Sequence, residues 1–391
     1  MTFWRVLFLL SGLAILMPLV IDIFLPSMPA IAASYGVETG EVQLTLASLN
    51  LGAALGQVIY GPLADRFGRR FVIVWTMAVF TAAGLASANP PSMEWMNALR
   101  FLQGLTAASG MIIIRAIVRD LYDGAQSTKM LAYTFVTGST MPVAAPIVGG
   151  FITVTLGWQI NMYIIGCTGL LVMLILWFWL EETGEPDASA LNIGTMMKAY
   201  AELLRSKQYL TYAFVGLGPF AGLFAILTAL SSILIEFMGV SPDTFGLLFA
   251  AVMAGNLVAS WIAGRWAETL GDTRLIVWGS LVCLISGVAA LLVVLSGLSS
   301  PTGIVLPSLG YMVGFALLIP AATAGAMSPF PHIAGRASSL IGLVHYGAGA
   351  AASLVLGLIA DGTDRPLSYA LAVCGVLSLI AIFPVLATKE K

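Results

Sequence analysis

The most constraining feature of this sequence is a series of apolar runs, each about as long as a lipid bilayer is thick. A helix needs roughly 20 apolar residues to cross the hydrocarbon core of a membrane. Only 9% of the residues are charged, whereas a soluble domain has about 25%. The sequence therefore predicts an all-α membrane protein with twelve spans, at residues 6–27, 42–62, 71–89, 95–117, 129–154, 158–180, 208–237, 244–266, 275–298, 303–327, 335–360 and 367–387.

One substantial polar stretch, residues 181–207, lies between the sixth and seventh runs. It divides the chain into an N-terminal half (1–180), a linker along the membrane surface and a C-terminal half (208–391). If the N-terminus is cytoplasmic, all but Arg100 and Arg365 of the 17 Lys and Arg residues fall on the cytoplasmic side. Because cytoplasmic loops carry an excess of Lys and Arg, we expect both termini in the cytoplasm.

The two halves share a short repeat. Gly61–Gly68 follows the second predicted span, Gly264–Gly271 follows the eighth, and both read G-x-x-A-(acid)-x-x-G. A parallel repeat of this kind is typical of transporters whose substrate site lies between the halves, near the middle of the membrane.

Several motifs resemble those of a known family. Gly61-Pro-Leu-Ala-Asp-Arg-Phe-Gly-Arg-Arg70 resembles the loop signature of the major facilitator superfamily, and Arg100-Phe-Leu-Gln-Gly104 resembles its proton-linked arginine motif. Pro142–Gly150 resembles the exporter signature, with Ala145 in place of the usual Gly. Asp22–Pro29 and Arg115–Tyr122 resemble the bicyclomycin/chloramphenicol-resistance (Bcr/CflA) branch of drug:proton antiporters.

This resemblance implies a major-facilitator fold of two six-helix halves in a bacterial inner membrane. It implies export of small amphipathic compounds, such as amphenicols, in exchange for protons. We expect a monomer, because one chain supplies both halves. It also implies that the loop after the second span latches the cytoplasmic side shut through Gly61, Asp65, Arg66, Gly68, Arg69 and Arg70, with Asp120 as a partner. The alternative is that these arginines only fix the membrane topology.

Asp22 is the most informative single residue, because an ionisable group inside a membrane usually faces a cavity, pairs with another group or carries protons. A helix that enters at Val6 still holds Asp22 within the bilayer core. Arg100 lies at a similar depth in the fourth span, with Gln103 on the same helix face. We expect Asp22 and Arg100 to couple protons to transport; the alternatives are a helix-end acid and a structural polar clamp.

The remaining candidates are weaker. His345 falls near mid-membrane and either relays protons or is hydrogen-bonded within the bundle. Pro142, Pro146, Gly149 and Gly150 form a hinge in the fifth span, or only a structural kink. The predicted substrate cavity is apolar with few polar groups, and it is lined by Asp22, Asn50, Gln57, Arg100, Gln103, Tyr133, Phe220, Phe224, Asn256 and His345.

Other classes of function find little support. The sequence has no nucleotide-binding loop, acyl-transfer triad or metal cluster, so we expect no enzyme and no cofactor beyond the proton gradient. The net charge of −2 argues against a nucleic-acid partner. Two alternatives remain open: a proton-coupled uptake symporter for a metabolite or chelate, and a non-transporting membrane receptor.

Overall fold

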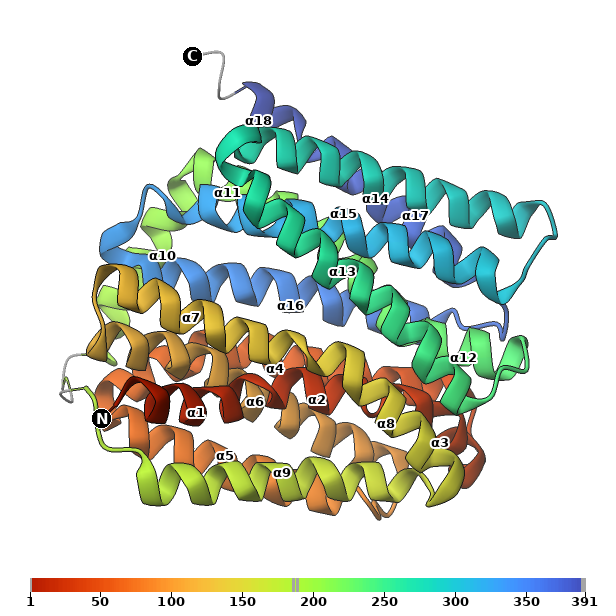
Figure 1. The fold of residues 1–391 in the computed structure, drawn as a ribbon, viewed down its shortest axis with the longest axis horizontal. Coiled ribbons are helices and arrows are strands. Elements are labelled where there is room, and N and C mark those ends of the chain that lie inside the picture. The colour runs from red at the N-terminus through yellow and green to blue at the C-terminus, as the bar shows by residue number, and fades with distance from the viewer. Residues whose placement is uncertain (1, 185–186, 188–189, 388–391) are drawn as a thin grey trace.

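The computed structural model describes residues 2–184, 187 and 190–387, and every regular element in these ranges is a helix (Figure 1). Glu185 of the predicted linker lies outside the described residues, as do Lys389 and Lys391 at the C-terminus.

Six spans form the N-terminal half. The first is broken into four segments, and the fifth is broken into two. In chain order the elements are α1 (Phe3–Ala14), α2 (Leu16–Asp22), η1 (Leu25–Ser27), α3 (Met28–Tyr35), α4 (Thr39–Phe67), α5 (Arg69–Ala86), α6 (Met93–Leu121), α7 (Gly124–Ser139), α8 (Met141–Thr155) and α9 (Trp158–Trp179).

The linker contributes one helix, and six further spans form the C-terminal half. The elements are α10 (Ile193–Arg205) in the linker, then α11 (Lys207–Val215), α12 (Leu217–Ser232), η2 (Ile233–Phe237), α13 (Pro242–Leu270), α14 (Asp272–Leu295), α15 (Pro301–Met327), η3 (Pro331–Ile333), α16 (Ala334–Leu358), α17 (Arg365–Ile380) and α18 (Phe383–Ala387).

The prediction of twelve spans is confirmed, and the largest difference concerns the first span. It was predicted to end at residue 27 but runs on to Tyr35. Pro26 and Pro29 each stand in the first turn of a new helical segment, where a proline costs no backbone hydrogen bond. The chain therefore continues to Gly36, whose left-handed backbone (φ 64°) ends the helix.

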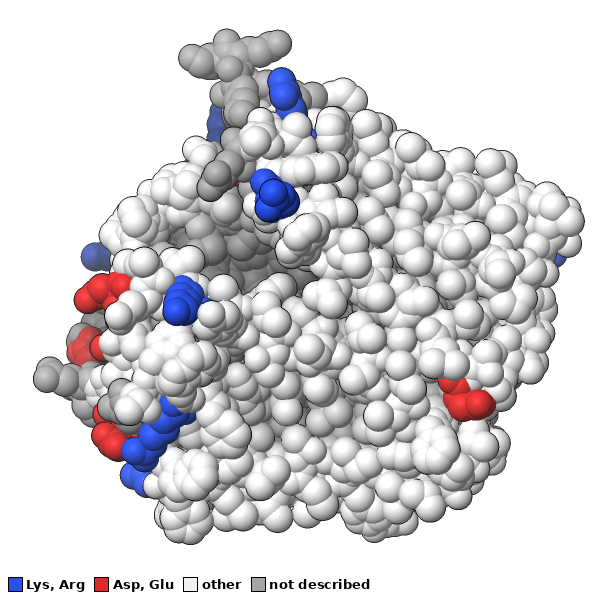
Figure 2. Space-filling view, viewed as in Figure 1, with Lys and Arg blue, Asp and Glu red and all other residues white. Residues whose placement is uncertain are grey.

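The helices run between two ends of the bundle. We name the end where α1 begins and where α4 and α6 end the terminal face, and the opposite end the far face. The two halves lie side by side, with the N-terminal half in the lower part of Figure 1 and the C-terminal half in the upper part. In Figure 2 most of the visible charged side chains gather at the terminal face.

Two helix pairs make the most extensive contacts between the halves. The pair α4 and α16 packs along most of its length, from Gly40 against Gly357 at the far face to Gln57 against Gly342 nearer the terminal face. The pair α8 and α13 crosses at the far face through Gly150 and Gly246, each of which meets the backbone of the other helix. From this crossing, α7 and α13 diverge toward the terminal face (Figure 1).

Candidate functional site

A cavity of about 450 Å³ lies between the halves, where α7 and α13 diverge. Its walls come from α1, α2, α6, α7 and α8 of the N-terminal half and from α12, α13, α15 and α16 of the C-terminal half. Figure 2 shows a hollow in the surface between α7 and α13 on the side of the terminal face. Toward the far face the halves are in contact at the glycine crossing of α8 and α13 and at Ser231, which is buried against Met28. These contacts separate the cavity from a second pocket of about 620 Å³ at the far face.

The wall from the C-terminal half is largely aromatic. Phe220 and Phe315 have ring centroids 5.0 Å apart, and Phe224 and Tyr346 have theirs 5.9 Å apart. All four rings line the cavity. Aromatic surfaces offer large apolar contact areas, and the polar groups on the walls are few. The cavity therefore suits an amphipathic organic molecule.

Asp22 lies inside this cavity at the end of α2. The span to which it belongs ends at Tyr35, thirteen residues further on, so the carboxyl group is about 20 Å from the far end of the span. The carboxyl group therefore lies well inside the first span and not at its far end. Asp22 is 4% exposed, and no ion pair to it is found in the described part of the chain.

Arg100 is fully buried behind α2 and does not reach the cavity. Its Nη1 donates to the carbonyl oxygen of Val20 and to Oε1 of Gln103, both at 2.9 Å, and its guanidinium carbon lies 4.1 Å from the centre of the Phe24 ring. Val20 and Phe24 are four residues apart and share a helix face. Asp22 is midway between them and points to the opposite side. Arg100 and Asp22 thus lie at one level, as the sequence predicted, but on opposite faces of the same helix.

Gln103 ties this arginine to a third helix. Its Nε2 donates to Oγ of Ser87 at 2.5 Å and to the carbonyl oxygen of Ala83 at 3.2 Å, both on α5 or at its end. By contrast, Nε and Nη2 of Arg100 have no hydrogen-bond partner among the residues that the structure describes. A buried cation is costly when its donors are unmatched, so the site holds unused binding capacity for a carboxylate.

The structure brings only some of the predicted cavity residues to the cavity. Asp22, Phe220, Phe224 and Asn256 line it, and so does Pro142 of the predicted hinge. Six others lie elsewhere in this conformation: Asn50, Gln57, Arg100, Gln103, Tyr133 and His345.

Each of these displacements has a packing reason. Asn50 and Gln57 are buried in the contact of α4 with α16, where Nδ2 of Asn50 is 3.5 Å from Oγ of Ser353. Tyr133 stacks on Trp4 at the outer surface, with ring centroids 6.4 Å apart. His345 lies behind the cavity wall, stacked on Phe220 with ring centroids 4.1 Å apart. Its Nε2 has no hydrogen-bond partner within the described part of the chain.

The fifth span is broken where the sequence predicted a hinge. Thr140 separates α7 from α8, and Pro142 is the second residue of α8. Within α8, Gly149 packs against the backbone of Ile23, and Gly150 packs against the backbone of Pro242 in the other half. The break and both glycines therefore position α8 at the closed far face, while its role as a pivot stays a prediction.

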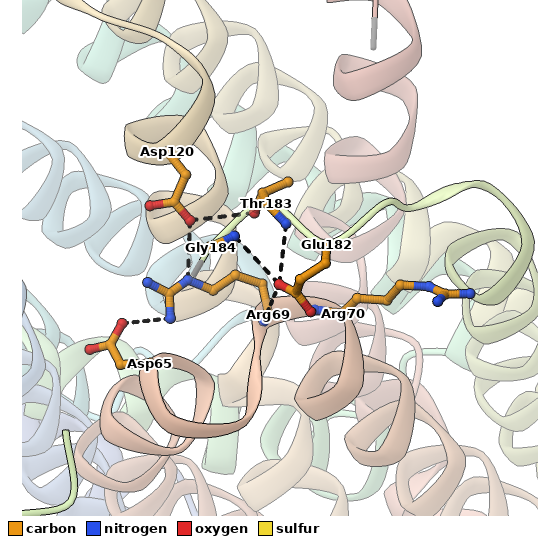
Figure 3. A network of polar contacts seen from close by, with 7 residues as sticks. All are labelled: Asp65, Arg69, Arg70, Asp120, Glu182, Thr183 and Gly184. Carbon is orange, nitrogen blue, oxygen red and sulfur yellow. Dashed lines mark hydrogen bonds and ion pairs between the residues drawn. The ribbon is translucent and has the colours of Figure 1, made fainter. Parts of the chain in front are cut away.

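The predicted latch residues form a polar network at the terminal face (Figure 3). Arg69 pairs with Asp65 at 2.5 Å and, through Nε, with Asp120 at 3.2 Å. Asp120 is thus the partner of an arginine of the loop, both within the N-terminal half, while the latch role of this pair stays a prediction. Arg66 takes no part in the network drawn in Figure 3, and an added Cβ on Gly61 would meet nothing within 4 Å.

Sequence reasoning missed the centre of this network, Glu182 of the linker. Its carboxylate accepts the backbone N–H groups of Arg69 at 2.7 Å and Arg70 at 3.1 Å, at the first turn of α5 (Figure 3). An anion at a helix N-terminus satisfies unpaired donors and the helix dipole. Gly68, with a φ of 92°, leaves room for this carboxylate, because a Cβ there would collide with it.

Sequence reasoning also missed several residues that line the cavity. They include Arg115, Met111 and Ile114 on α6, Phe315 on α15 and Tyr346 on α16. The sequence did contain a signal for Arg115, because this residue is the first of the Arg115–Tyr122 motif. We had expected it only at the cytoplasmic end of a helix.

The fold and this cavity match a known family. The model of the Major Facilitator Superfamily matches residues 10–353. The chain belongs to the major facilitator superfamily. This membership confirms the predicted fold and the resemblance, and it makes the chain a multi-pass membrane transporter of a small-molecule substrate.

Relatives of this superfamily transporter cover almost its whole length. It is 30% identical over 377 residues to a bicyclomycin resistance protein homolog of Haemophilus influenzae, covering 96% of this chain and 94% of the relative. It is 28% identical over 336 residues to a chloramphenicol resistance protein of Pseudomonas aeruginosa, covering 85% and 78%. A crystal structure of a D-xylose-proton symporter superposes with a TM-score of 0.79 at 16% identity, covering 97% of this chain and 96% of the other.

Proposed function

We propose that this transporter exports small amphipathic organic compounds from a bacterial cytoplasm across the inner membrane, in exchange for protons, by alternating access. The observation that carries the proposal is Asp22, a carboxyl group in the middle of the first span that lines the central cavity. An ionisable group at that depth, facing a cavity, is typical of proton relays.

The direction of the cavity follows from charge. The basic loops predicted to be cytoplasmic belong to the terminal face, because α4 ends there and α5 begins there with Arg69 and Arg70. The far face is therefore periplasmic, and the cavity between α7 and α13 is open to the cytoplasm. An exporter takes up its substrate in this inward-facing state.

Arg100 supplies the counterpart of Asp22. Two of its donors are unmatched in the inward-facing state, and only a helix backbone separates it from the carboxyl group. A rotation of α2 about its axis, made easier by the breaks at Ile15 and Ile23, would bring Asp22 toward Arg100. Deprotonation favours that position and protonation favours the cavity, so each proton bound selects one state of the first span.

The substrates named for the relatives suggest the test compound. Chloramphenicol efflux is measured in cells or proteoliposomes with an imposed proton gradient, for the wild type, Asp22→Asn and the control Asp123→Asn, whose carboxylate is exposed at the terminal face. We expect flux that stops when the gradient is collapsed, that is lost in Asp22→Asn and that is kept in Asp123→Asn.

Each other outcome identifies a different error. Unchanged flux in Asp22→Asn would make Asp22 structural and move the coupling to Arg100 or His345. Gradient-driven accumulation would identify an uptake symporter, and binding without flux would identify a receptor. Absence of chloramphenicol flux in the wild type would remove the amphenicols from the substrates.

A further inference from the structure

Arg115 is a cation at the terminal-face end of the cavity that the proton-coupling scheme does not use. It lies on α6, six residues before the end of the helix, and it is one of two residues with a formal charge that line the cavity in the described part of the chain; the other is Asp22. The side chain is exposed. Topology requires only a basic residue near the membrane surface and does not require that it point between the halves.

The partners of Arg115 leave most of its hydrogen-bonding capacity free. Its Nη1 donates to Oγ of Ser338 on α16, a neutral partner. No ion pair to Arg115 is found among the described residues, and α7, which forms the neighbouring wall, has no acidic residue between Gly124 and Ser139. A guanidinium has five N–H donors in a planar fork, so a ligand oxygen pair can approach the remaining ones.

The surroundings add a surface for an apolar body. One turn before Arg115, Met111 lines the cavity and its Sδ is 3.9 Å from the hydroxyl oxygen of Tyr346. Beyond Tyr346 the wall continues through Phe224 and Phe220. The cavity therefore presents a cation at its mouth and an aromatic wall that leads inward from it.

The second charge of the cavity lies far from this cation. Arg100 marks the level of Asp22, and Arg115 is fifteen residues further along the same helix, which is about 22 Å. A ligand group at Arg115 is thus well separated from the proton-binding carboxyl group. With low-dielectric walls around it, an unpaired cation attracts anions and repels cations more strongly than it would in water.

We propose that Arg115 is the head-group site of the substrate, and that this transporter favours amphipathic compounds with an anionic or strongly electronegative oxygen pair, such as a carboxylate, over organic cations. The guanidinium fork matches the geometry of a carboxylate in two parallel hydrogen bonds. This inference rests on the proposed function in taking the cavity as the substrate site, and it names the substrate class of that cavity.

The test uses three probes that share one body: chloramphenicol, its hemisuccinate ester with one negative charge, and its glycinate ester with one positive charge. Equilibrium binding to the purified full-length protein in detergent is measured by titration calorimetry at low and high salt. In the wild type we expect the hemisuccinate to bind more tightly than the glycinate by about tenfold or more, the fold-change of one charge-assisted hydrogen bond, with the ratio falling at high salt.

Two variants and one control isolate the residue. Arg115→Gln is expected to bring the hemisuccinate-to-glycinate ratio to within about twofold of one, since the charge is gone and only neutral hydrogen bonds remain. Arg115→Lys keeps the charge without the fork and is expected to retain part of the ratio. Arg119→Gln removes a cation one turn further along α6. Because Arg119 does not line the cavity, this variant is expected to behave as the wild type. Size-exclusion chromatography establishes that each variant is folded.

Several results would overturn the inference. They are a wild-type ratio near one, tight binding of the glycinate, binding of none of the three probes, or the same ratio in Arg115→Gln as in the wild type. Because binding is measured without a gradient and without flux, the outcome is independent of the efflux experiment. Proton-coupled export can fail while the charge preference holds, and the preference can fail while export holds.

Discussion

The central guanidinium carbon of Arg100 lies 4.1 Å from the centre of the Phe24 ring, and neither side chain is exposed. This contact holds the guanidinium group against one face of the first span, and Asp22 lies on the opposite face. Desolvated cation–π contacts stabilise by about 2 kcal/mol or more. The Phe24 ring therefore offsets part of the cost of burying the two unmatched N–H donors of Arg100.

Arg100→Lys is expected to abolish gradient-driven flux while the protein still folds. Lysine keeps a positive charge but cannot stack on Phe24 and reach Val20 at once, so the group that receives Asp22 is lost. Flux and thermal unfolding are measured together, with Arg119→Lys as the matched exposed control. Flux in Arg100→Lys that equals the wild type at every pH would show that any cation suffices there.

Phe24→Leu is expected to lower the free energy of unfolding by about 1–2 kcal/mol, through loss of the cation–π contact and of buried aromatic area. It should leave Arg100 bonded to Val20 and Gln103. The midpoint of thermal unfolding in detergent measures the change. A larger loss, accompanied by loss of flux, would mean that the ring positions Arg100 for coupling as well as stabilising it.

Gly246→Ala is expected to open the far face. An added Cβ would lie 2.9 Å from Cα of Ile147 and would also meet the carbonyl oxygen of Pro146, so α8 and α13 must separate. Gly347→Ala is the matched control, because a Cβ there meets nothing within 4 Å and alanine favours the helix by about 1 kcal/mol. A cysteine at Ser231, which is fully buried against Met28 of the other half near the far face, reports the opening by its rate of alkylation. Equal rates in the two variants would contradict the closure described here.

The spans could be predicted from the sequence, but the residues of the cavity wall largely could not. The thickness of the bilayer determines the length of every apolar run, and this constraint holds for each span separately. A residue such as Asn50 is shielded from lipid whether it faces the cavity or the contact of α4 with α16, so hydrophobic pattern does not distinguish the two positions. The same ambiguity hid Arg115, whose place at a helix end agreed equally well with a role in topology.

Tertiary contacts account for the other differences. The first span was predicted to be shorter because prolines usually indicate the end of a helix. Pro26 and Pro29 instead each lie in the first turn of a new helical segment. Glu182 does not belong to a recognisable sequence motif in the linker. Its role becomes visible only in the fold, where the residues after α9 contact the start of α5. The twelve-span fold was therefore accessible from local sequence, while the site depended on which faces meet.

Glu182→Gln is expected to destabilise the present conformation by about 1–2 kcal/mol. The neutral amide still accepts hydrogen bonds but loses the attraction of a carboxylate for the helix N-terminus. Thermal unfolding measures this loss, with Glu181→Gln as the control, since Glu181 is exposed and forms only a 3.8 Å ion pair with Arg5. An equal effect of the two changes would mean that the stabilisation comes from the overall charge and not from the capping of α5 by Glu182.

Gly61→Leu is expected to trap the protein in the present conformation, with the terminal face open, without loss of stability. In this state the space beside Gly61 is open, and the same is true of Gly264, its counterpart in the repeat. A glycine at a position with free space is required only if another conformation brings a neighbour close to it. In alternating access that conformation is the one with the terminal face closed, so leucine at residue 61 would obstruct the closure and leave the present packing intact. Thermal unfolding close to that of the wild type, together with loss of flux and low alkylation of a cysteine at the buried Ser231, is the expected combination. Normal flux in Gly61→Leu would mean that α4 does not approach the C-terminal half at this point, and Gly264→Leu would then be the corresponding test from the other half.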